Sequence, residues 1–336
     1  MAVARLVETD GHKTFYLEDG PKDGPLMVFV HGWPELSYSW RYQLPAMARL
    51  GFRAVAPDLR GYGRSSTYDS HADYSQEKVV ADMLALVDAL GSETAIWVGH
   101  DWGSPTVWNI ASHHPDRCRA VASLCVPYAT LEYGVERVIE LVDRNVYAMD
   151  EFPVGQWDYQ LYYQECFEQA QAVMEADVEN TLKALFRSGD PDTVGKPALT
   201  AMIRSSGGWF GGASQAPDLP LDSAVISAEV LAVYSDALRR SGFFGANSYY
   251  MNHEVNMNYA KNALDQGRLT MPVLFMPARY DSVCESVDSP LARPMRAKCS
   301  NLTETIVDSG HWMAQECPQA VNGALEAWLN IKAGTS

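Results

Sequence analysis

The chain has 336 residues, of which 47% are hydrophobic, and its 42 acidic and 26 basic residues leave a net charge of −16. This composition predicts a globular protein large enough for one α/β domain with an insertion, or for two smaller domains. The acidic balance argues against binding to nucleic acid and to anionic membranes.

Six cysteines are spread along the chain without a CxxC pair: Cys118, Cys125, Cys166, Cys284, Cys299 and Cys317. Because a large core does not need disulfides, we expect free thiols and a reducing, cytoplasmic location. The first residues lack the continuous apolar stretch of a secretory signal. No run of about 18 apolar residues predicts a membrane span.

The first part of the chain alternates between apolar runs and helical patterns. Short apolar runs predict buried strands at residues 26–31, 53–57, 94–100 and 119–127. Residues 75–91 place apolar side chains at helical spacing and end at Gly91, and a second helix is expected to end before Pro115. Strands that alternate with helices predict a mostly parallel, doubly wound sheet with helices on both faces.

Residues 131–265 have a different pattern, rich in aromatic residues and helical spacing and without a clear buried strand. Strand patterns return at 271–281 and 302–311, and residues 320–332 predict a closing helix. The simplest organisation is an α/β core interrupted by a helical cap. The expected segments are core residues 1–130, cap residues 131–265 and core residues 266–336.

Four short motifs follow predicted strands and carry polar side chains. They are HGWP (31–34), GHDWG (99–103), ARYD (278–281) and DSGH (308–311). Ligands of open parallel sheets bind at the carboxyl ends of the strands. We therefore expect the four loops to meet at one edge of the sheet.

GHDWG has the form of a nucleophile elbow with a carboxylate at its centre. Gly99 and Gly103 leave room for a tight turn from strand to helix, and the strained turn exposes the side chain of Asp101. The free N–H groups at the start of a helix favour an anion there. An isolated Asp before a helix is usually an N-cap, but the flanking glycines and the preceding strand favour a nucleophile.

A nucleophile that must be regenerated needs a base, and the base needs a residue that orients it. His311 and Asp281 follow later strands, so the order is nucleophile, acid, histidine, as in Ser-Asp-His triads on similar sheets. Asp308 is a weaker candidate for the acid because it is close in sequence to His311. His31 and His100 are interpreted as structural histidines that hydrogen-bond loop backbone.

The chain resembles the epoxide hydrolases of the α/β-hydrolase fold, in the microbial and fungal type with one hydrolase domain and a cap. The matching motifs are HGWPELSYSWRYQ (31–43), APDLRGYGRSS (56–66), GHDWGS (99–104) and DSGHWMAQECP (308–318). HGxP alone is moderately specific, whereas the whole set in this order is strong.

The resemblance implies conversion of an epoxide to a vicinal diol through a covalent ester on Asp101. Water activated by His311 and Asp281 would then hydrolyse the ester. An epoxide has no carbonyl group, so a carboxylate that displaces at saturated carbon replaces the usual serine. The backbone N–H groups of Trp33 and Trp102 would form the oxyanion hole, with a cis peptide bond before Pro34. The expected partners are a small apolar epoxide and water, and no metal or cofactor is expected.

The same family uses two cap tyrosines to protonate the ring oxygen, because an alkoxide is a poor leaving group. WDYQLYYQE (157–165) matches the first cap motif and assigns the role to Tyr159. GANSYYMN (245–252) matches the second and assigns it to Tyr250, with the adjacent Tyr249 as the alternative. Aromatic residues at helical spacing more often form a packed core.

Three other functions are compatible with parts of the pattern. A haloalkane or haloacid dehalogenase shares the Asp nucleophile and the histidine but needs no phenol, because halide leaves without protonation. A serine esterase would need Ser at position 101, and Ser104 lies in the wrong turn position. A non-catalytic ligand receptor of the same fold could retain the triad. Substrate, selectivity and oligomeric state are not predicted.

Overall fold

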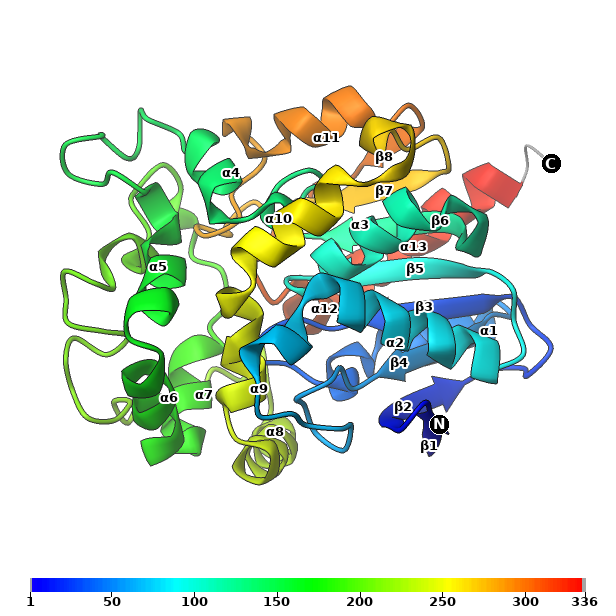
Figure 1. The fold of residues 1–336 in the computed structure, drawn as a ribbon, viewed down its shortest axis with the longest axis horizontal. Coiled ribbons are helices and arrows are strands. Elements are labelled where there is room, and N and C mark those ends of the chain that lie inside the picture. The colour runs from blue at the N-terminus through cyan, green and yellow to red at the C-terminus, as the bar shows by residue number, and fades with distance from the viewer. Residues whose placement is uncertain (1, 334–336) are drawn as a thin grey trace.

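The computed structural model describes residues 2–333, and within them the strands form one eight-stranded sheet (Figure 1). The strands are β1 (Val3–Thr9), β2 (His12–Asp19), β3 (Leu26–Val30), β4 (Arg53–Pro57), β5 (Ala95–His100), β6 (Cys118–Leu124), β7 (Val273–Met276) and β8 (Leu302–Glu304). Their order is β1-β2-β4-β3-β5-β6-β7-β8. β2 pairs antiparallel with β1 and β4, and the other neighbours are parallel. The predicted mostly parallel sheet is confirmed.

The central strands are apolar because both faces of the sheet are covered. Every residue of β3 and β5 is buried, as expected for a parallel sheet between helical layers. β1 and β2 are not among the predicted strands, since β2 alternates between buried and less buried residues and most of β1 is exposed. The local signal for them is Asp10–Gly11, a two-residue turn with positive φ at both residues.

Helices lie on both sides of the sheet (Figure 1). Those of the core are α1 (Gln43–Arg49), α2 (Gln76–Ala89), α3 (Gly103–His113), α11 (Arg293–Lys298), α12 (Met313–Glu316) and α13 (Pro318–Ala333). α1 packs against α13, and α2 packs against α3. None of the described helices combines the length and apolarity needed to cross a membrane.

Between β6 and β7 the described chain contains helices and loops but no strand. The helices are α4 (Val135–Glu140), α5 (Asp158–Glu165), α6 (Phe167–Ala176), α7 (Val178–Leu185), α8 (Ala228–Ser241), α9 (Phe244–Ser248) and α10 (His253–Lys261). Figure 1 shows α5 to α8 gathered at one end of the sheet, opposite the two termini. The indole Nε1–H of Trp33 donates to Asn247 Oδ1 at 3.0 Å, which ties α9 to the loop after β3.

Candidate active site

Asp101 sits at the turn between β5 and α3 and is 7% exposed. Its φ of 47° lies in the left-handed region, which is uncommon for a residue other than glycine. A Cβ at Gly103 would lie 2.1 Å from the carbonyl oxygen of Val30, and one at Gly99 would lie 2.5 Å from the carbonyl oxygen of Gly103. Both glycines are therefore required by close backbone approach, and the turn has the geometry of a nucleophile elbow.

The two carboxylate oxygens of Asp101 have different surroundings. The backbone N–H of Trp33 donates to Oδ1 at 2.6 Å, whereas Oδ2 lies 3.6 Å from His311 Nε2. A Cβ at Gly32 would lie 2.4 Å from Oδ1, so only glycine allows this approach of the two loops. Oδ1 is thus held by a backbone donor, and Oδ2 faces the histidine.

The Trp33–Pro34 peptide bond is cis, as the resemblance implies. Within the described residues, the backbone N–H of Trp102 makes no hydrogen bond to Asp101. The indole of Trp102 packs edge-on against the ring of Tyr250, with ring centroids 5.2 Å apart. Pro34 is buried in the loop after β3 and does not line the cavity described below. The donor from Trp33 is therefore the only hydrogen bond from these three residues to the side chain of Asp101 in the described part of the chain.

His311 is paired with Asp281. Nδ1 of His311 lies 2.7 Å from Asp281 Oδ2, and the other oxygen of Asp281 accepts backbone N–H groups from Val283 and Cys284. Burial alone would raise the pKa of Asp281, but His311 and these donors lower it. Asp308, the weaker candidate, is bound instead to the exposed Arg279 at 2.5 Å.

His311 therefore lies between two carboxylates. Burial alone would lower the pKa of His311, but Asp281 and the hydrogen bonds to Asp101 and Asp281 raise it well above its usual value. Both carboxylates therefore favour the protonated form of the His311 ring.

Tyr159 of α5 and Tyr250 of the short helical turn after α9 face each other, with ring centroids 5.7 Å apart. Burial raises the pKa of both phenols well above the usual value, so both remain protonated at neutral pH. Gln160 Nε2 donates to the hydroxyl of Tyr159 at 3.1 Å. The hydroxyl of Tyr249 points elsewhere and donates to the carbonyl oxygen of Arg60 at 3.1 Å.

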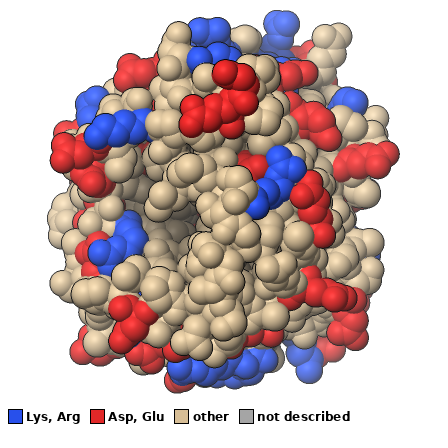
Figure 2. Space-filling view, turned by 90° about the vertical axis from the view of Figure 1, so that its left-hand side faces the viewer, with Lys and Arg blue, Asp and Glu red and all other residues tan. Residues whose placement is uncertain are grey.

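A cavity of about 590 Å³ brings five of these side chains together: Trp33, Asp101, Tyr159, Tyr250 and His311. Asp281 also lines it, as do residues of the segment 184–200 and Trp209. Much of the segment 184–200 is exposed, including Leu199 at 80%. Figure 2 shows that the face formed by the cap helices is hollowed. The predicted catalytic residues thus meet in a chamber between the sheet and the helical insertion.

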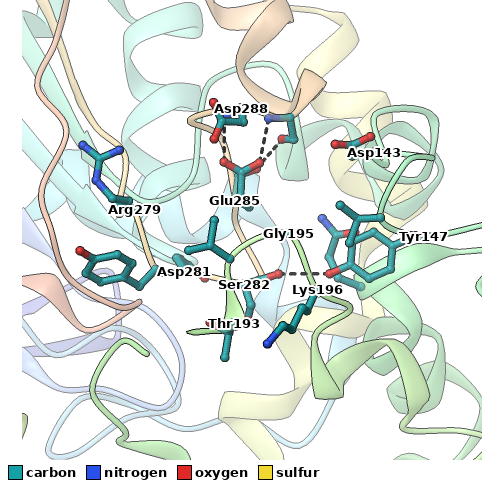
Figure 3. Close-up of a pocket in the computed structure, with 15 residues that line it drawn as sticks. Asp143, Tyr147, Thr193, Gly195, Lys196, Arg279, Asp281, Ser282, Glu285 and Asp288 are labelled. Atoms are coloured by element: carbon teal, nitrogen blue, oxygen red, sulfur yellow. Dashed lines mark hydrogen bonds between the residues drawn. The ribbon is translucent and has the colours of Figure 1, made fainter. Parts of the chain in front are cut away.

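A smaller pocket of about 100 Å³ adjoins the chamber behind the Asp281 loop (Figure 3). It shares Thr193, Lys196, Tyr280, Asp281 and Ser282 with the chamber. The hydroxyl of Tyr147 donates to the carbonyl oxygen of Ser282 at 3.4 Å, as Figure 3 shows, and accepts from the backbone N–H of Ala198 at 3.1 Å. Tyr147 therefore links the loop after β7 to the rim of the chamber.

Glu35 was missed by the sequence interpretation. Its carboxylate lies 2.7 Å from His100 Nδ1, and His100 Nε2 lies 2.8 Å from the carbonyl oxygen of His311. Burial opposes both charges, yet each partner stabilises the other, so the pKa of His100 is raised and that of Glu35 is lowered. His31, in contrast, makes its hydrogen bonds among the described residues to backbone groups of its loops, as predicted, and its ring packs edge-on against Tyr62.

Two groups of potential metal ligands occur among the described residues: His100, Cys125 and His311, and Asp281, Cys284 and His311. The ligand atoms of each group lie within 4.8 Å of one another. Both groups include His311, so a metal bound by either group would coordinate the imidazole that is predicted to act as the base.

Comparisons with known proteins agree with this geometry. A family model described as the alpha/beta hydrolase fold matches residues 25–316. The chain is 33% identical to epoxide hydrolase A of Mycobacterium tuberculosis, over 97% of this chain and 96% of the relative. It is 34% identical to bifunctional epoxide hydrolase 2 of Sus scrofa, over 96% of this chain and 54% of the relative. The chain therefore spans about half the length of that mammalian relative.

Solved structures show the same likeness. Epoxide hydrolase A from Mycobacterium thermoresistibile superposes with a TM-score of 0.79 at 32% identity, over 98% of both chains. An epoxide hydrolase from an endophytic Streptomyces gives a TM-score of 0.78 at 34% identity, over 98% of this chain and 95% of that chain. With its elbow, its histidine–carboxylate pair and its two facing tyrosines, the chain belongs to the epoxide hydrolases of the α/β-hydrolase fold.

Proposed function

We propose that this enzyme converts epoxides to vicinal diols through a covalent ester on Asp101. The observation that supports this most directly is the chamber itself. One cavity holds a carboxylate, two protonated phenols and an imidazole paired with a second carboxylate. A dehalogenase would need no pair of phenols, because halide leaves without a proton.

In the first step, Oδ2 of Asp101 attacks a ring carbon of the epoxide. The new bond joins Oδ2 to that carbon, and the bond between this carbon and the ring oxygen breaks. The developing alkoxide takes a proton from Tyr159 or Tyr250. The hydroxyls of both residues supply the hydrogen bonds that a poor leaving group needs. Oδ1 stays bound to the N–H of Trp33, which leaves Oδ2 free to react.

In the second step, water hydrolyses the ester. Ester formation removes the negative charge of Asp101, which is one of the groups that raise the pKa of His311. The pKa of His311 then falls, so that the ring can give up a proton that restores the phenol, and the neutral ring can then accept a proton from the attacking water. Water attacks Cγ of Asp101, the Cγ–Oδ2 bond breaks, and the departing Oδ2 takes a proton from the imidazolium and leaves as a hydroxyl of the diol. Asp281 stabilises the imidazolium, and the N–H groups of Trp33 and Trp102 stabilise the oxyanion that forms at Oδ1.

We further propose that residues 131–265 act as a cap over the core segments 1–130 and 266–336. This insertion contributes Tyr159 and Tyr250, whereas the core contributes Asp101, Asp281 and His311. The proposed substrate is a small apolar epoxide, with water as the second reactant and no nucleic acid as a partner. The cytoplasmic location expected from the six cysteines stays a prediction.

A change of His311 to Gln tests the mechanism. Without a base the ester should form and persist, so intact-protein mass spectrometry should show one added substrate mass after incubation with styrene oxide. Asp101→Ala should show neither the added mass nor diol. If His311→Gln stays unmodified while the wild-type enzyme turns over, the covalent route is wrong. Release of halide from a chloroalkane without diol from any epoxide would favour the dehalogenase.

A further inference from the structure

Five aromatic rings form a packed wall at the chamber, and all of them except Tyr163 line it. This aromatic wall consists of Trp33, Tyr159, Tyr163, Trp209 and Tyr250. Seven pairs of these rings are in contact, with ring centroids 4.4 to 6.2 Å apart. These are ordinary packing distances for aromatic rings. The two phenols proposed to bind the ring oxygen are thus part of a close-packed surface.

Trp209 completes the wall from a loop that depends on glycine. The loop reads GGWFGG, and Gly207, Gly208, Gly211 and Gly212 all have positive φ. A Cβ at Gly208 would lie 2.6 Å from the hydroxyl of Tyr162. The indole of Trp209 stacks on Trp33 at 5.7 Å and meets Tyr159 edge-on at 5.6 Å. The loop therefore places a large rigid side chain beside the reacting groups.

The rest of the chamber is lined by other segments and adjoins a second pocket. The remaining lining residues come from the segments 184–200, 280–283 and 310–312. The smaller pocket shown in Figure 3 opens behind two of these segments, since it shares Thr193 and Ser282 with the chamber. Leu185 and Leu199 supply apolar surface on this side. A bound substrate has room to extend in this direction, away from the aromatic wall.

We propose that Trp209 closes the chamber behind Tyr159 and Tyr250, so that the enzyme takes epoxides substituted on one ring carbon only. This inference rests on the proposed function, because it assumes that the two phenols bind the ring oxygen while Asp101 Oδ2 attacks. Those contacts fix the three-membered ring, and its two carbons then face opposite sides. The substituted carbon faces the segment 184–200, and the other carbon faces the aromatic wall, where only hydrogen atoms fit.

Two isomers of epoxyhexane test this proposal without a change in overall hydrophobicity. One has the ring at the chain end, and the other has it at the chain centre, with an ethyl group on each ring carbon. The wild-type enzyme should prefer the terminal isomer in kcat/KM by at least about tenfold, the discrimination expected when an apolar group must be excluded from a pocket. Trp209→Ala should reduce this ratio by about tenfold, because truncation opens the space that the second ethyl group needs.

Two control variants distinguish the effect of the Trp209 indole from a general disturbance of its loop. Trp209→Phe keeps an aromatic ring in the wall and should retain most of the preference. Phe210→Ala truncates the neighbouring side chain, which does not line the chamber, and should leave the ratio unchanged. An equal shift in Phe210→Ala would assign the effect to loop disturbance and contradict the role of Trp209.

The outcomes also separate this inference from the proposed function. If the wild-type enzyme hydrolyses both isomers equally, or if Trp209→Ala leaves the ratio unchanged, the proposed exclusion of a second substituent by Trp209 is wrong, although epoxide hydrolysis stands. If neither isomer nor styrene oxide yields diol, the proposed function itself fails, and this inference fails with it.

Discussion

Asp101, His311 and Asp281 show how single residues acquire their roles from their neighbours. Three residues far apart in sequence meet because each follows a strand whose carboxyl end lies at the same edge of the sheet. Chain order was enough to predict their meeting. The choice between Tyr249 and Tyr250 was not predictable in this way, because consecutive residues of a turn point in different directions and a small change in its phase exchanges them.

The tyrosines provide a residue-level prediction. Tyr159→Phe and Tyr250→Phe should each slow formation of the ester by about 100-fold, the usual contribution of a positioned general acid. Single-turnover measurements of ester formation should show this, with the double variant close to inactive. Tyr249→Phe is the matched control, since it loses only the bond to the carbonyl of Arg60. A comparable loss of rate in Tyr249→Phe would contradict the assignment of Tyr250.

Among the structural elements, the turn from β5 to α3 has the tightest steric limits. Gly103→Ala should destabilise the protein by about 3 kcal/mol, because the new methyl group meets the carbonyl oxygen of Val30. Gly323→Ala in α13 makes a useful comparison, since a Cβ there has no neighbour within 4 Å. It should stabilise by about 0.5 to 1 kcal/mol through helix propensity. Urea unfolding of both variants measures the difference, and a mild effect of Gly103→Ala would show that the elbow can relax.

The predicted elements were reliable in the buried parts of the sheet and less so elsewhere. β3, β4 and β5 lie within the predicted runs or coincide with them, whereas β6 overlaps the run 119–127 but begins one residue earlier, at Cys118. The last two predicted strands, 271–281 and 302–311, are longer than β7 and β8, which contain only Val273–Met276 and Leu302–Glu304. A single bridge between Ala278 and Val307 continues their pairing. Beyond it the chain leaves the sheet, so that Asp281 and His311 can turn toward each other.

For the whole molecule, we expect the buried histidines to make the folded state less stable at acidic pH. Burial lowers the pKa of six of the eight histidines, and that of His253 falls to about 4. His253 is 3% exposed, and neither ring nitrogen has a hydrogen bond within the described residues. Above pH 6.5 this residue is neutral in both the folded and the unfolded chain. As the pH falls from 6.5 to 4, only the unfolded chain gains the proton, so the folded state loses stability.

His253→Met should remove this part of the acid sensitivity. The difference of about 2.5 pKa units corresponds to about 3 kcal/mol of unfolding free energy lost between pH 6.5 and pH 4. Urea unfolding over this range should therefore give a flatter curve for the variant than for the wild-type enzyme. Parallel curves would show that His253 titrates normally in the folded protein.

The sequence by itself determined the class of the sheet, the identity of the loops at its edge and the resemblance to the family, because apolar periodicity and short motifs are local properties. It also pointed to an aspartate in place of a serine. Tertiary structure distinguished Tyr250 from the alternative Tyr249, and it alone decided the pairing of Glu35 with His100 and the place of Trp209 in the aromatic wall. Each depends on contacts between residues separated by tens of positions or more, and no local pattern encodes the direction in which those side chains meet.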